Sequence, residues 1–162
     1  MPLLTQESYA VIHRAGDKLV LQNDRGDTVT IEMASRHDHT ETQITVFACR
    51  VGDRRAITLP RRASNFRIAG RRWLSLTADD QAEVIDMRTR RVVTKALKGA
   101  RRTLLPDGTL IVNDAAGTLT ARAPGAAQAT TLQATGATAL ATAGSTVYWT
   151  AGGAAHSSTA RA

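Results

Sequence analysis

A short module recurs along this chain: a turn that contains glycine, one or two polar residues, and then an apolar strand. The module occurs at residues 15–21, 69–76, 106–112 and 143–149. Its glycines stand at positions 16, 70, 108 and 144, so the intervals between them are 54, 38 and 36 residues. Self-similarity at a period of roughly 20–50 residues is typical of repeat architectures, in which each unit buries its apolar faces against its neighbours. The repeat therefore constrains the fold more than any other feature.

The apolar residues between the turns follow the spacing of strands rather than helices. No window longer than about ten residues repeats apolar side chains at helical positions. Short runs rich in β-branched residues alternate with turns instead, and they include residues 28–31, 44–47, 56–59 and 110–112. We expect an all-β meander of about fourteen to sixteen short antiparallel strands. The apolar fraction of 43% argues against a disordered chain, and the single cysteine excludes a disulfide within the chain.

Two of the modules carry a family resemblance. The sequence Leu-Pro-Asp-Gly-Thr-Leu at residues 105–110 resembles a turn that is common in bacterial β-propeller repeats. Residues 144–150 are similar to blades of actinobacterial proteins of the WD40-like or quinoprotein-like superfamily. The resemblance covers about residues 65–160 and implies a β-propeller-like array of about four antiparallel four-stranded blades. A β-sandwich or an irregular barrel is the alternative, because either is built from a similar number of strands.

The repeat divides the chain into four expected units within one domain over residues 1–162. These units are residues 9–64 with an extra hairpin at 44–59, then 65–99, 100–135 and 136–160. Four blades are about the lower limit for a closed propeller, and an open array exposes an apolar face at each end. We therefore expect pairing with a second copy or membership in a longer propeller. The last unit is short of a fourth strand, for which residues 3–13 are the candidate.

The charge is concentrated in the middle of the chain. Residues 50–102 carry fifteen basic and five acidic side chains, whereas the whole chain has a net charge of +7. Most of these arginines stand in pairs beside expected turns, and alternate turns of a meander emerge at the same edge. One edge should therefore gather the candidate anion- or partner-binding residues, which are Lys18, Arg71, Arg72, Arg88, Arg90 and Arg91. Arg101 and Arg102 are expected at the opposite edge.

Such a group of cations favours an acidic protein, a polyanion or a nucleic acid backbone as partner, with a merely solubilising surface as the alternative. Nucleic acid is the less favoured of these partners because aromatic side chains are scarce. We expect Phe66, Trp73, Tyr148 and Trp149 in the core rather than on the surface as stacking platforms.

No arrangement of residues predicts catalysis, a metal site or a cofactor. The His37-Asp38-His39 segment places two imidazoles at strand spacing, but only Glu41 is a nearby third ligand, and a polar loop is favoured. Cys49 follows apolar residues and is expected to be a buried, inert thiol. Asp79 and Asp80 are typical of a turn rather than of paired catalytic carboxylates. Glycine-flanked nucleophilic serines and phosphate-binding loops are absent from the sequence.

These observations predict a non-enzymatic binding or scaffold module for protein–protein interaction. Two alternatives remain: an anion- or nucleic-acid-binding module that uses the arginines, and a portion of a larger propeller enzyme. No run approaches the roughly 20 apolar residues that span a bilayer, so we expect no membrane span. Residues 1–7 lack the pattern of a signal peptide, which favours the cytoplasm, although a secreted protein without its leader has the same appearance.

Overall fold

The computed structural model describes residues 10–15, 18–22, 28–38, 41–50, 56–60, 62–70, 72–97 and 101–160. Within these ranges the protein is all-β and has no helix, as expected. The described residues form sixteen strands in four antiparallel sheets, and within each sheet every strand pairs with the next one along the chain. The all-β prediction is therefore confirmed, and the strand count lies within the expected range.

The four sheets follow one another in chain order. Sheet 1 contains β1 (Ala10–Ala15), β2 (Lys18–Gln22), β3 (Thr28–Asp38), β4 (Glu41–Arg50) and β5 (Ile57–Leu59). Sheet 2 contains β6 (Ser64–Ala69), β7 (Trp73–Ala78), β8 (Gln81–Asp86) and β9 (Arg91–Leu97). Sheet 3 contains β10 (Arg101–Leu104), β11 (Leu110–Asn113), β12 (Leu119–Arg122) and β13 (Thr130–Gln133). Sheet 4 contains β14 (Ala139–Ala143), β15 (Thr146–Ala151) and β16 (Ala154–Thr159).

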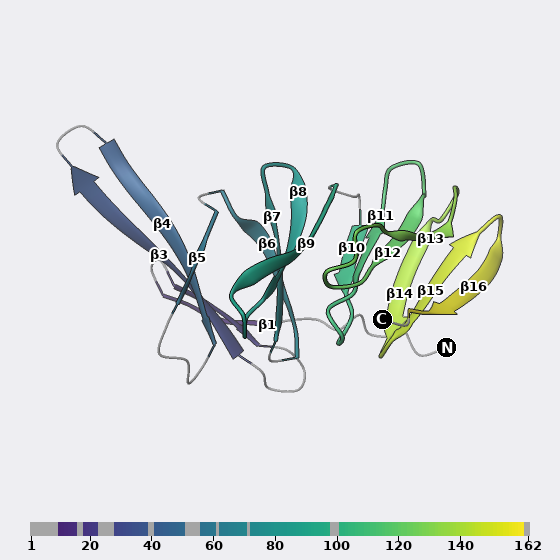
Figure 1. Ribbon diagram of the computed structural model, residues 1–162, viewed down its shortest axis with the longest axis horizontal. Helices are drawn as coiled ribbons and strands as arrows, with labels where there is room; N and C mark the ends of the chain where they lie inside the picture. The colour runs from purple at the N-terminus through teal and green to yellow at the C-terminus, as the bar shows by residue number, and fades with distance from the viewer. Residues whose placement is uncertain are drawn as a thin grey trace.

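The sheets stand side by side in an open row, with sheets 1 and 4 at its two ends (Figure 1). The described sheets do not close into a ring. The expectation of four strands in each unit is met in sheets 2 and 3, whereas sheet 1 has five strands and sheet 4 has three described strands. The additional strand of sheet 1 is β5, which pairs with β4 from Val46 opposite Leu59 to Ala48 opposite Ile57.

Sheet 2 is covered on both faces. Every residue of β7 is buried, because its alternate side chains enter two different cores. One face contributes Leu74 and Leu76 to the core shared with sheet 1. The other face contributes Trp73 and Ala82 to the core shared with sheet 3. Burying one leucine side chain completely is worth about 1.5–3 kcal/mol, so these two interfaces hold the middle of the row together.

Among the described residues, sheet 4 is covered on one face only. Val147 and Trp149 of β15 pack against Ile111 and Leu119 of sheet 3 in the third core. The residues of the opposite face are exposed or half-buried throughout, and Tyr148 there is 38% exposed. The prediction that Tyr148 lies in the core is wrong, because it alternates with Val147 and Trp149 and therefore points to the other face.

The start of the described chain belongs to the first sheet. Ala10–Ala15 pairs with Lys18–Gln22, so residues 10–13 do not supply a fourth strand to sheet 4. A hairpin between segments this close in sequence costs little loop-closure entropy, and it is therefore favoured over a distant pairing. Residues 3–9 of the same prediction lie outside the described residues.

Candidate functional site

Two arginine-bearing turns lie at the same end of sheet 2. The β6–β7 turn and the β8–β9 turn are adjacent because Trp73 stands opposite Asp86, and Asp86 stands opposite Arg91. The amide N–H of Met87 donates to the carbonyl of Arg72 at 2.7 Å and links the two turns directly. The structure therefore brings together four of the predicted site residues, here called the arginine rim: Arg72, Arg88, Arg90 and Arg91.

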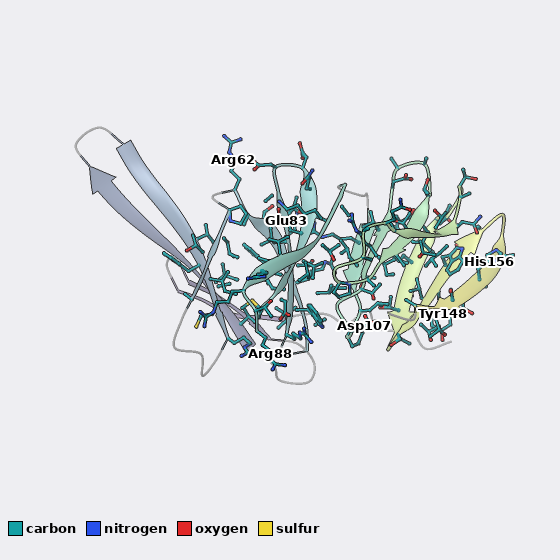
Figure 2. All side chains as sticks on the ribbon, in the orientation of Figure 1. Arg62, Glu83, Arg88, Asp107, Tyr148 and His156 are labelled. Carbon is teal, nitrogen blue, oxygen red and sulfur yellow. The ribbon has the colours of Figure 1, made fainter. Side chains whose placement is uncertain are left out.

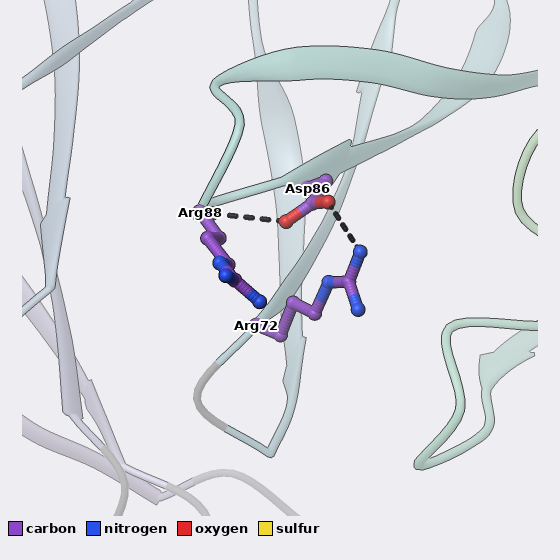
Figure 3. A network of polar contacts seen from close by, with 3 residues as sticks. All are labelled: Arg72, Asp86 and Arg88. Carbon is purple, nitrogen blue, oxygen red and sulfur yellow. Dashed lines mark hydrogen bonds and ion pairs between the residues drawn. The ribbon is translucent and has the colours of Figure 1, made fainter.

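A buried carboxylate organises this end of the sheet. Asp86 is 2% exposed, and its Oδ2 accepts from Nη2 of Arg72 at 2.8 Å. Its Oδ1 accepts from the backbone N–H of Arg88 at 2.9 Å (Figure 3). Burial raises the pKa of Asp86, but the hydrogen bonds from Arg72 and from the Arg88 backbone outweigh that effect and leave the pKa below its ordinary value. Asp86 is therefore ionised at neutral pH and fixes both turns.

Arg72 has a structural role within the rim. Its guanidinium carbon lies 4.4 Å from the centroid of the Trp73 ring, a cation–π contact that adds to the Asp86 ion pair. The side chain is half exposed, so its charge stays at the surface but is compensated by Asp86. Arg72 thus helps to shape the rim more than it adds to the net charge there.

The other three rim arginines are exposed, and no described acidic side chain compensates their charge. The amide of Arg90 donates to the carbonyl of Asp86 at 2.7 Å, and Arg90 adopts a positive φ of 60° that closes the turn tightly. Arg88, Arg90 and Arg91 are all exposed. Among the described residues no carboxylate forms an ion pair with any of the three. In the described structure the turn therefore presents three exposed cations and one ion pair.

The remaining predicted cations are Lys18, Arg71 and Arg101. Lys18 begins β2, but its side chain lies outside the described part of the structure, as does all of Arg71. Arg101 is exposed, and its Nη1 donates to the carbonyl of Thr138 at 2.9 Å. These three residues therefore neither add to nor subtract from the described rim.

Arg102 is not a surface residue. It is 9% exposed, and its guanidinium donates to Oγ1 of Thr77 and to the carbonyl of Asn65. Its place beside an expected turn predicts an exposed side chain, and that prediction is wrong, because the side chain lies on the face of β10 that packs against sheet 2, where these oxygens accept its hydrogen bonds. Arg102 links sheets 2 and 3 at the end opposite the arginine rim.

A groove of about 340 Å³ between sheets 2 and 3 was not predicted from the sequence. Its floor includes Leu110 and Val112, and its polar residues include Asp114, Thr120 and Arg122. The one available signal was that Asp114 and Arg122 are two of only four charged residues after position 102. Which face of a strand they occupy depends on a register that the sequence pattern alone leaves open.

The structure describes the candidate metal-binding and nucleophilic residues only in part. His37 and Asp38 lie in β3, but their side chains, and all of His39, are outside the described residues. Within the described part, no three His, Cys, Asp or Glu side chains gather as metal ligands. Cys49 is half-buried rather than fully buried, and its Sγ donates to the carbonyl of Arg50 at 3.4 Å. Asp79 and Asp80 form the β7–β8 turn with φ of 46° and 62°, as predicted.

Comparison of the chain with protein-family models, with curated proteins and with solved structures finds no match. Among the described residues there is no helix of the length and hydropathy needed to cross a membrane. The function must therefore be inferred from the geometry of the chain's own surfaces.

Proposed function

We propose that this chain is a non-enzymatic, propeller-like binding module that holds an acidic protein surface on its arginine rim. The observation that carries the proposal is the combination of three exposed arginines, which no described carboxylate pairs, with a buried carboxylate that fixes their turn. A turn fixed in this way presents its cations with less loss of conformational entropy on binding than a flexible loop does.

An acidic protein is favoured over a nucleic acid because no aromatic residue in the described part of the chain is exposed at the rim. Trp73 is 8% exposed beneath Arg72, and Phe66 is packed against the core. The exposed Tyr148 lies on sheet 4, away from the rim. Single-stranded nucleic acids gain much of their affinity from base stacking, whereas carboxylates need only charge and hydrogen-bond donors.

The test is a binding titration with a fluorescently labelled polyglutamate peptide at low ionic strength. The rim variant Arg88→Glu/Arg91→Glu leaves the strained Arg90 untouched. Its control, Arg62→Glu/Arg101→Glu, changes the net charge by the same amount at exposed positions outside the rim. Figure 2 shows Arg62 and Arg88 at opposite ends of sheet 2.

We expect the rim variant to weaken binding at least tenfold and the control less than threefold. Wild-type affinity should fall steeply with salt, because the rim is exposed and its charges are screened. Equal losses in the two variants would show that only net charge matters, and they would overturn the proposal. Tighter binding of single-stranded DNA than of polyglutamate would contradict the choice of an acidic protein.

A further inference from the structure

The groove between sheets 2 and 3 is a second candidate binding site, separate from the arginine rim. Ala96 of β9 lies on one side, and the sheet 3 face with Leu110, Val112 and Thr120 forms the other. The β12–β13 loop is tied to β9, since the amide of Gly125 donates to the carbonyl of Val93 at 2.9 Å. The groove is therefore bounded by backbone that is hydrogen-bonded in place.

A positioned cation lies at one end of the groove. The Arg122 guanidinium donates to the carbonyls of Ala126, Lys95 and Ala127, so three of its five N–H donors are used. No carboxylate pairs with Arg122 among the residues that the structure describes. A half-buried guanidinium with two remaining donors and no counter-ion among the described residues is suited to a carboxylate ligand.

A positioned anion lies at the other end. Oδ1 of Asp114 accepts from the amides of Ala116 at 2.9 Å and Thr118 at 2.8 Å. The backbone N–H of Thr118 lowers the pKa of Asp114, so the carboxylate is ionised at neutral pH. In the described part of the chain no basic side chain forms an ion pair with Asp114.

The register of sheet 3 sets the backbone spacing between the two ends of the groove. Arg122 stands opposite Leu110, and Thr120 stands opposite Val112. Thr118, beside Asp114, is four residues from Arg122, which corresponds to about 13 Å between their Cα atoms. The surface between the two charges is the apolar floor of Leu110 and Val112.

We propose that this groove binds a short, extended peptide with free termini, its carboxylate on Arg122 and its ammonium group on Asp114. A peptide of three residues spans about 10 Å and its charged ends extend it further, which is comparable with the backbone spacing of about 13 Å between Thr118 and Arg122. Small side chains of such a peptide would lie over Leu110 and Val112. The volume of about 340 Å³ is at the lower end of typical ligand sites, so a ligand of this size fits.

Calorimetric titration with trialanine, N-acetyl-trialanine and trialanine amide tests the proposal on the wild-type chain. We expect trialanine to bind and each blocked peptide to bind at least tenfold more weakly, because each lacks one terminal charge. Absence of trialanine binding, or equal affinity for all three peptides, would overturn the proposal.

The variant Asp114→Asn supplies a second test. Asparagine retains the oxygen that accepts the Ala116 and Thr118 amides, so the turn is preserved. We expect this variant to lose at least tenfold in affinity for trialanine and to bind N-acetyl-trialanine as the wild type does. Unchanged trialanine affinity would contradict the role of Asp114. The variant Arg88→Glu/Arg91→Glu should bind trialanine normally, which separates this site from the arginine rim.

Discussion

Sheets 2 and 4 are built from the same kind of hairpin meander but have opposite surroundings. Sheet 2 lies between two neighbours, every residue of β7 is buried, and its end carries the arginine rim. Among the described residues sheet 4 is covered on one face, its other face is exposed or half-buried, and its strands are rich in Ala, Thr and Ser and contain no Asp, Glu, Lys or Arg. The position of a sheet in the row, rather than its topology, therefore decides how strongly it is held.

The same difference between the sheets also matters for binding. The turns of sheet 2 can carry uncompensated cations because the sheet beneath them is fixed by two cores and by the Asp86 network. An equal number of cations on sheet 4 would stand on a sheet that is fixed from one side only.

The largest expected difference is in the free energy of unfolding that is lost when one side chain of sheet 2 or one of sheet 4 is replaced. Leu74→Ala removes a fully buried side chain from the core between sheets 1 and 2, and we expect a loss of about 3 kcal/mol in the free energy of unfolding. Tyr148→Thr changes an exposed position of sheet 4 and should cost no more than about 0.5 kcal/mol. Urea denaturation followed by circular dichroism measures both, and equal costs would remove the distinction between the sheets.

A smaller difference in stability is expected between glycine substitutions in the equivalent turns of sheets 3 and 4. Gly108 has φ of 89°, and a Cβ there would lie 2.5 Å from two atoms of the buried Trp73 ring. Gly108→Ala should therefore cost about 2–3 kcal/mol through backbone strain and overpacking. Gly144→Ala, in the equivalent turn of sheet 4, also has a positive φ but meets nothing within 4 Å, so about 1 kcal/mol is expected. Thermal unfolding of the two variants side by side tests this order.

The smallest expected effect concerns the carboxylate of sheet 2. Asp86→Asn keeps an acceptor for the Arg88 amide but loses the charge that pairs with Arg72, so we expect a loss of about 1–2 kcal/mol at pH 7. The pKa of Asp86 is lowered in the folded state, so its contribution is present above the unfolded value of about 4 and is lost as pH falls through the folded value.

The wild type should consequently lose its advantage over Asp86→Asn as the pH falls below about 4. Chemical denaturation of both proteins across this range measures the effect. A constant difference at every pH would contradict the role given to the ionised carboxylate.

The sequence pattern was sufficient for the local elements and insufficient for the contacts between sheets. Gly70, Gly108 and Gly144 all adopt the positive φ that the predicted turns require, and Asp79 and Asp80 form the expected turn. These features depend on residues close together in the chain, so local turn chemistry determines them.

The side chains whose surroundings the sequence does not predict are those that depend on which face of one sheet packs against the next. Arg102 is paired across an interface with Thr77 and Asn65, and Tyr148 lies on the face of sheet 4 that no core covers. Arg122 and Asp114 gain their significance from the register of β11 and β12. A shift of one residue would reverse all of these assignments, and composition does not specify it.

Hydrogen exchange followed by mass spectrometry, with and without polyglutamate, tests the central claim most directly. The amides of Met87, Arg88 and Arg90 are already hydrogen-bonded within the rim turn, and a bound partner should slow their exchange further. We predict added protection in residues 87–91 and none in residues 139–159. Protection in sheet 4 instead, or an unchanged pattern at saturating polyglutamate, would contradict the assignment of binding to the arginine rim.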